Sequence, residues 1–240
     1  MLFRSDHLDR GLVRVRGPAA HEDSSAHRVL PEAHGRDEPH VEVVLGAERE
    51  VREAEGQRTA VGVVVPVDEH RIDPGGHVLL HHRKIHELSM GHDLYTRGTQ
   101  LRVAETRLGT IGLMICADAF VEGHFISRTL GLMGAQLILS PCAWAVPPDH
   151  DNSRTPYGGL WTGCYAPVAR EFGLGIAGCS SVGSITSGPW AGWHCIGHSL
   201  VVDPHGKTQA VGKHGPDACE LIVTDLDLEL PRRPEYRPVP

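Results

Sequence analysis

The pattern of apolar and polar positions divides the chain into two parts. From residue 60 onward, short apolar runs bounded by glycine, proline or aspartate have the length of buried strands. They predict strands over residues 60–65, 77–81, 101–105, 109–116, 134–140, 174–179, 198–203, 207–211 and 220–225. Apolar residues at helical spacing predict helices over residues 126–133 and 160–172. A strand, a helix and a strand in succession indicate a parallel pair, so we expect an α/β layered sandwich.

Residues 1–58 have a different composition, rich in Arg, His, Glu and Pro and poor in aliphatic runs. Residues 17–28 are predicted to be loop or disorder, and residues 42–55 are predicted to be a charged helix that ends at Gly56. We expect one domain over residues 1–240, with 1–58 atypical or disordered and 231–240 a Pro-rich tail. A shifted reading frame would also produce this composition, a hypothesis that sequencing of the coding DNA tests.

Composition and charge exclude several classes of partner. The 240 residues have a net charge of -7 and no Lys/Arg cluster, so we expect neither nucleic acid nor an anionic membrane as a partner. No apolar run approaches the length of a membrane span and the first residues lack the apolar core of a signal peptide, so we expect a cytoplasmic protein. The six cysteines form no CxxC pair, and we expect them to stay reduced.

Cys116 ends one of the predicted strands, directly before the segment that leads into a predicted helix. At such a corner the backbone N–H groups of the first helical turn face the sulfur and lower the pKa of the thiol, which favours a nucleophile. The alternative is a buried structural cysteine, because free cysteine is among the most buried residue types.

Several segments, taken in chain order, carry a family resemblance. They are Val78-Leu-Leu-His-His-Arg-Lys84, Gly109-Thr-Ile-Gly-Leu-Met-Ile-Cys116, Gly134-Ala-Gln-Leu-Ile-Leu-Ser-Pro141, Ser199-Leu-Val-Val-Asp-Pro-His-Gly206 and Glu220-Leu-Ile-Val-Thr-Asp225. Over residues 60–228 the chain resembles the nitrilase, or carbon-nitrogen hydrolase, superfamily. The resemblance implies an α-β-β-α sandwich with sheets of mixed strands, assembled as a homodimer or higher homo-oligomer. It also implies hydrolysis of a non-peptide C–N bond, in a small amide or nitrile, with no cofactor.

The resemblance also implies a Glu-Lys-Cys triad. By position, Cys116 is the nucleophile that forms a thioester, and Lys84 is the cation beside the developing oxyanion. The backbone N–H of Ala117 is the second oxyanion donor, and such a donor is worth roughly 3 kcal/mol. The base should be the glutamate of an N-terminal Pro-Glu pair, here Glu32, and Glu87 is expected as an auxiliary carboxylate near Lys84. The residues before Glu32 do not read as a buried strand, and the alternative is a solvated loop carboxylate.

Other chemistry-bearing residues lie after the strand 134–140, at the strand end where ligands of α/β sheets bind. Trp144, Asn152, Tyr157 and Trp161 are therefore candidate substrate contacts, with aromatic packing as the alternative for the rings.

The neighbouring histidines lack the four converging ligands of a zinc site, so we expect no metal and interpret them as loop or surface residues: His81, His82 and His86.

Together with the family resemblance, the sequence predicts a carbon-nitrogen hydrolase. An inactive homologue whose degraded N-terminus lacks the catalytic glutamate, and a cysteine enzyme using a Cys-His pair, remain open alternatives.

Overall fold

The computed structural model describes residues 10–16, 41–45, 68–72, 78–89, 92, 96–106, 108–186, 188, 190–218 and 221–228. Its centre is a six-stranded sheet with the strand order β13-β12-β9-β7-β6-β5. The strands are β5 (Val103–Thr106), β6 (Gly109–Leu113), β7 (Leu137–Cys142), β9 (Gly175–Ser180), β12 (Leu200–Val202) and β13 (Thr208–Val211). Strands β6, β7 and β9 are mutually parallel, and the outer pairs are antiparallel. The predicted parallel pair and the predicted closing hairpin are therefore confirmed.

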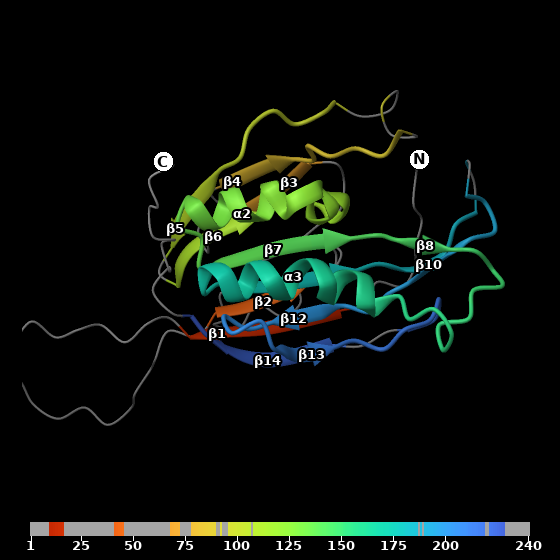
Figure 1. Ribbon diagram of the computed structural model, residues 1–240. Coiled ribbons are helices and arrows are strands. Elements are labelled where there is room, and N and C mark those ends of the chain that lie inside the picture. The colour runs from red at the N-terminus through yellow and green to blue at the C-terminus, as the bar shows by residue number, and fades with distance from the viewer. Residues whose placement is uncertain are drawn as a thin grey trace, which may run out of the picture.

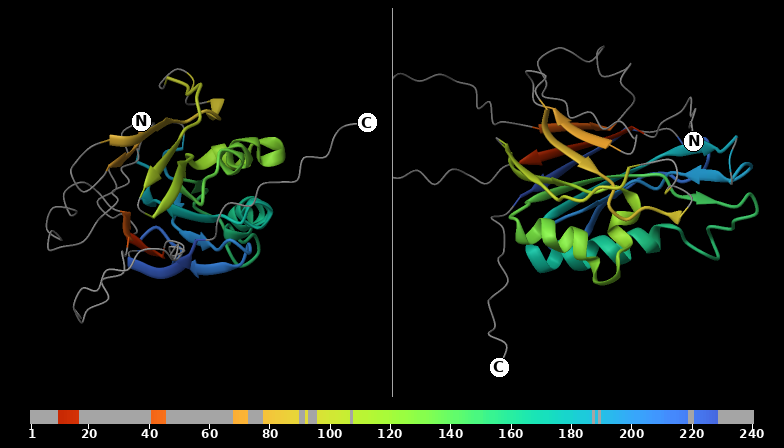
Figure 2. Two further views of the ribbon diagram at one scale, coloured as in Figure 1. Left: turned by 90° about the vertical axis from the view of Figure 1, so that its left-hand side faces the viewer. Right: turned by 90° about the horizontal axis from the view of Figure 1, so that it is seen from above.

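Two helices, α2 (Phe125–Leu132) and α3 (Gly158–Phe172), cover one face of this sheet (Figure 1). Both were predicted from their apolar spacing, and α3 ends at Gly173 with a positive φ, as expected for a helix C-terminus. Two short 3-10 helices, η2 (Cys116–Phe120) and η3 (Glu122–His124), lie between β6 and α2. Seen from above, the helices lie on one side of the sheet, and β1 and β3 lie on the other (Figure 2).

The remaining strands form three smaller sheets. Strand β1 (Arg10–Arg16) lies between β14 (Leu221–Asp227) and β2 (Val41–Leu45), and β3 (Asp68–Ile72) pairs with β4 (Val78–Arg83). Strand β11 (His194–Ile196) lies between β8 (Ala145–Val146) and β10 (Val182–Ser184). The helix predicted over residues 42–55 is wrong at its start, because residues 42–45 pair with β1 as a strand. The strand predicted over residues 60–65 lies outside the described residues.

Strand β7 shows why the central strands were recognisable. All six of its residues are buried, because helices cover one face of the sheet and strands the other. Ile138 packs with the helices, in a cluster that includes Trp161, whereas Leu137 and Leu139 point to the opposite face. The fold is therefore a mixed α/β sandwich, as predicted. Within the described residues, no helix combines the length and the apolar character that crossing a membrane requires.

Candidate active site

Cys116 lies in the turn that follows β6, and its backbone is unusual. Its φ angle is +48°, in the left-handed region that an L side chain rarely adopts, at a cost of about 1–3 kcal/mol. The side chain is 6 % exposed. The predicted strand-end corner is confirmed, but the segment directly after Cys116 is the 3-10 helix η2, and the α-helix begins only at Phe125. A strained turn of this kind fixes the direction of the sulfur.

The surroundings of the Cys116 sulfur act on its protonation in opposite senses. Burial raises the pKa of the thiol. The charge of Lys84 and the backbone N–H groups of Ala143 and Ala117 lower it, and the charge of Asp118 raises it slightly. The net pKa lies above the ordinary cysteine value, so the thiol holds its proton until a base takes it. Two backbone N–H groups nevertheless contact the sulfur, and the positive charge of Lys84 acts on it. N–H groups and a cation beside a nucleophile are groups of the kind that stabilise an oxyanion.

Lys84 comes from the segment that directly follows β4, and it pairs with Glu87. The Lys84 Nζ–Glu87 Oε2 distance is 3.6 Å, and the two side chains are 13 % and 5 % exposed. The other carboxylate oxygen of Glu87 has no hydrogen-bond partner among the described residues. The structure therefore brings Lys84, Glu87 and Cys116 to one location. Glu32 lies outside the described residues.

The backbone around Lys84 is held in place from the following loop. Gly98 donates its N–H to the carbonyl of Lys84 at 2.8 Å, and the Arg97 side chain donates to the carbonyl of Ile85 at 2.7 Å. A Cβ atom at Gly98 would lie 2.1 Å from the carbonyl oxygen of Arg83, so only glycine fits there without a shift.

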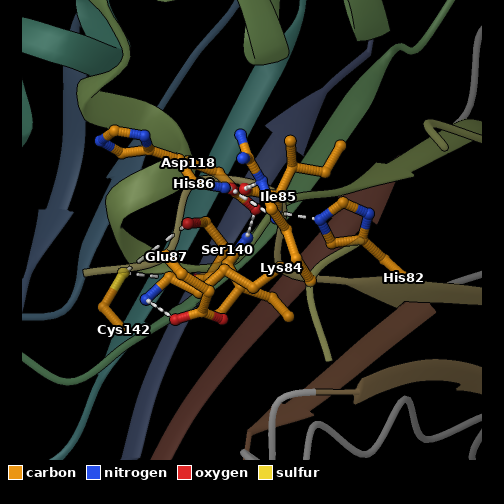
Figure 3. A network of polar contacts seen from close by, with 10 residues as sticks. His82, Lys84, Ile85, His86, Glu87, Asp118, Ser140 and Cys142 are labelled. Atoms are coloured by element: carbon orange, nitrogen blue, oxygen red, sulfur yellow. Dashed lines mark hydrogen bonds and ion pairs between the residues drawn. The ribbon is translucent and has the colours of Figure 1, made fainter. Parts of the chain in front are cut away.

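Asp118 is a residue that the sequence reasoning missed. Its carboxylate is fully buried and accepts four hydrogen bonds, which converge on it in Figure 3. Three come from backbone N–H groups, those of Ile85 at 3.1 Å, His86 at 2.7 Å and Ile115 at 2.9 Å. The fourth comes from the His82 Nε2 atom at 2.9 Å. A charged residue within the apolar stretch around Cys116 was the available signal, because a buried carboxylate needs several donors.

His82 corrects one sequence-based interpretation. It is 4 % exposed and bonds to Asp118, so it is neither a loop nor a surface residue. Its position on β4 turns its side chain toward η2, a contact that sequence spacing does not reveal. Among the residues that the structure describes, no three His, Cys, Asp or Glu side chains are arranged to hold a metal ion.

The aromatic candidates gather beside the nucleophile turn. Phe120, at the end of η2, packs against Trp144 with ring centroids 5.5 Å apart and against Trp161 at 4.6 Å. Trp161 and Tyr157 are almost fully buried, whereas Trp144 is partly exposed. Trp144 directly follows Ala143, whose N–H contacts the Cys116 sulfur.

Asn152 and Cys142 have structural contacts. The side-chain oxygen of Asn152 accepts the backbone N–H of Tyr157 at 2.8 Å, which orders the approach to α3. The Cys142 thiol lies 3.4 Å from the Tyr165 hydroxyl, which in turn donates to Ser140 at 3.0 Å. Burial raises the pKa of Cys142 well above its ordinary value, so this thiol is protonated and inert at neutral pH.

Comparison with known proteins identifies the family of the chain. The carbon-nitrogen hydrolase family matches residues 70–233, and the chain belongs to this family. A Schizosaccharomyces pombe protein named "Probable nitrilase C965.09" is 26% identical over 156 residues, which are 65% of this chain and 51% of that protein. The chain spans about half the length of the curated relatives it matches.

Solved structures share the fold. A carbon-nitrogen hydrolase from Helicobacter pylori has a TM-score of 0.57 at 21% identity, covering 65% of this chain and 59% of that one. An amidase from Nesterenkonia sp. AN1, solved as a mutant with acrylamide added at its active site cysteine, has a TM-score of 0.51 at 21% identity. That alignment covers 66% of this chain and 61% of the amidase.

Proposed function

We propose that this protein hydrolyses the C–N bond of a small amide or nitrile through a thioester on Cys116. The observation that carries the proposal is the strained turn at Cys116, where two backbone N–H groups contact one buried sulfur and the positive charge of Lys84 lowers the pKa of its thiol. This arrangement presents a nucleophile and its oxyanion donors together before any substrate binds. Preorganised donors of this kind are usually the largest single contribution to acyl transfer.

The proposed reaction on an amide proceeds in two steps. A carboxylate takes the Cys116 proton, the sulfur attacks the carbonyl carbon, and the oxyanion lies between Lys84 and the N–H of Ala117. The C–N bond then breaks, the amine leaves with the transferred proton, and the acyl group stays on sulfur as a thioester. Water, activated by the same carboxylate, releases the acid and restores the thiol. A nitrile would first give a thioimidate, whose hydrolysis releases ammonia and leaves the same thioester.

The mechanism needs a carboxylate base other than Asp118. The raised pKa of Cys116 means that a separate group must take its proton. The oxygens of Asp118 already accept four hydrogen bonds, so Asp118 cannot serve. We assign the role to Glu32 from the family pattern. Glu87 is assigned an auxiliary role, in which its ion pair orients the Lys84 ammonium toward the oxyanion.

The names of similar proteins suggest the substrate class, and the aromatic side chains beside Cys116 suggest which residues contact the substrate. The names of the relatives include a nitrilase and an amidase, which together cover the two proposed substrates. We propose that Ala117 and Trp144 contact the substrate directly. Asn152, Tyr157 and Trp161 have a supporting role in the core beside Trp144. The rings of Tyr157 and Trp161 are buried, and Asn152 accepts the backbone N–H of Tyr157.

We also propose that the helical layer packs against a second copy of the chain. Three apolar side chains at the two ends of α2 are strongly exposed, Phe125, Leu132 and Met133, and Leu160 of α3 is 44% exposed. Monomeric proteins seldom leave several large apolar side chains uncovered on one layer. Sedimentation analysis of the wild type and of Leu132→Glu with Phe125→Glu tests this: dimers that the double variant dissociates would support it, and a monomeric wild type would refute it.

Ammonia release from a panel of aliphatic and aromatic amides and nitriles tests the proposed function. We expect turnover that Cys116→Ala abolishes and that Cys142→Ala leaves within a few-fold of the wild type, because Cys142 is a buried neighbour without oxyanion donors. No turnover from a folded wild-type protein on the whole panel would instead favour an inactive homologue.

A further inference from the structure

We propose that Asp118 is a positioning residue for this reaction: its carboxylate ties the turn that presents Cys116 to the segment that presents Lys84. The inference rests on the proposed function for its consequence in catalysis, but the contacts themselves do not depend on it. Asp118 touches neither the substrate nor the reacting atoms in the proposed mechanism. Its effect is exerted through the two residues that do.

The contacts connect two separate parts of the fold. Ile115 is the residue directly before Cys116, and its N–H bonds to Asp118 across the turn. Ile85 and His86 are the two residues directly after Lys84, and both donate to the other oxygen of the same carboxylate. The nucleophile turn follows β6 of the six-stranded sheet, whereas Lys84 follows β4, which belongs to a separate two-stranded sheet. One side chain thus fixes the distance between elements that share no strand pairing.

His82, on β4, adds a further hydrogen bond to the Asp118 carboxylate. Its ring donates to Asp118 from two residues before Lys84, so the segment is held on both sides of the lysine. Both groups are almost fully buried, so a donor or acceptor that loses its partner here is costly to leave unsatisfied. The carboxylate must be ionised to accept all four bonds.

The negative charge of Asp118 raises the pKa of the Cys116 thiol. Burial alone would raise the pKa of this carboxyl, but hydrogen bonds from His82, His86 and Ile115 lower it below its ordinary value. The resulting negative charge opposes formation of the Cys116 thiolate, although more weakly than Lys84 favours it. A residue whose charge works against the nucleophile, and whose oxygens are all engaged with backbone and His82, has a geometric rather than an electrostatic role.

The first test compares one variant with a matched control. Asp118→Asn is nearly isosteric, but an amide offers one acceptor oxygen and cannot accept from all four donors. The control is Asp203→Asn, because Asp203 is a largely buried carboxylate that accepts the N–H groups of His205 and Lys207 and the Gln209 side chain in the β12–β13 turn, away from the site. For each protein we would measure the pH profile of Cys116 alkylation by iodoacetamide, read on the Cys116 peptide by mass spectrometry, together with kcat and Tm.

The direction of the pH shift separates the two possible roles. If Asp118 positions Lys84, Asp118→Asn moves Lys84 away, and the alkylation profile shifts to higher pH; kcat falls by roughly 100-fold, the scale expected for a 1 Å misplacement. If the carboxylate acts only through its charge, its removal shifts the profile to lower pH. Asp203→Asn should lower Tm but leave both the profile and kcat at their wild-type values.

A second pair of variants keeps the inference testable if Asp118→Asn does not fold. His82→Leu removes the fourth donor and should shift the profile upward, whereas His82→Gln, which retains an N–H donor at that position, should restore it. Unshifted profiles with wild-type kcat in both folded Asp118→Asn and His82→Leu would overturn the inference. Alkylation needs no turnover, so a wild type that releases no ammonia would contradict the proposed function while this measurement still reports on the placement of Lys84.

Discussion

Lys84 acts on the Cys116 thiol from a different sheet: its charge lowers the pKa of a cysteine that the central sheet presents. The two residues share no hydrogen-bonded strand pair, and β4 pairs only with β3 among the described strands. Their proximity therefore depends on the loops and on the buried polar contacts that join the sheets.

Replacing Lys84 with methionine should reduce catalysis and change the reactivity of the thiol. The loss of an oxyanion donor lowers kcat by about 10²–10³-fold, and the loss of the positive charge raises the pKa of Cys116. Ammonia release and the pH profile of alkylation measure the two effects separately. Equal rates in Lys84→Met and the wild type would remove Lys84 from the mechanism.

Replacing Glu87 with glutamine should lower kcat by less than the loss of Lys84 does. The amide keeps the shape but not the charge of the partner, so Lys84 remains present and is less well oriented. The matched control is Glu171→Gln, which breaks a more exposed ion pair with Arg128 far from the site. If both variants keep the wild-type kcat, the Lys84–Glu87 pair is structural only.

Gly98→Ala should damage both stability and activity. The added Cβ would lie against the carbonyl oxygen of Arg83, so the segment that carries Lys84 must shift. We expect a loss of about 1–3 kcal/mol in the free energy of unfolding, measured by chemical denaturation, and a lower kcat. Gly159→Ala is the control, because nothing lies within 4 Å of its Cβ and alanine favours the helix α3 that contains it.

The free energy of unfolding should fall at alkaline pH. Burial raises the pKa of Cys195 to about 11 in the folded state, so the folded protein binds this proton more tightly than the unfolded chain does. The contribution is complete below the unfolded pKa of about 9 and is lost as the pH rises toward 11, up to roughly 2 kcal/mol. Denaturation of Cys195→Ser should show a shallower decline between pH 9 and pH 11, and an identical slope would contradict the assignment.

The elements that could be predicted from the sequence are those whose apolar residues follow the spacing of a buried strand or of a helix. Strands β6, β7 and β9 are continuous apolar runs because both faces of the sheet are covered, and α2 and α3 have helical spacing. Strands β1 and β2 were not predicted. Strand β1 includes three arginines in seven residues, and the charged residues after β2 favoured a helix over residues 42–55. Their place in a sheet comes from pairing with β14 at the other end of the chain.

The site was predictable only where a residue type is itself informative. The place of Cys116 at the end of a buried strand indicated a candidate nucleophile, and the resemblance to the carbon-nitrogen hydrolases indicated Lys84. The left-handed backbone at Cys116 leaves no such trace, because nothing in a single sequence distinguishes φ +48° from an ordinary turn. The contact between His82 and Asp118 joins residues 36 positions apart, so it depends on the packing of β4 against η2.

In the proposed mechanism, Cys116 carries the acyl group of the substrate as a thioester. The direct measurement is the mass of the Cys116 peptide after the protein is mixed with an amide that it turns over and is quenched in acid. We expect the mass of that peptide to increase by the acyl group of the substrate. The increase should be absent in Cys116→Ala, which should also lose ammonia release. Continued ammonia release by Cys116→Ala, with no acyl group on the Cys116 peptide of the wild type, would contradict this mechanism.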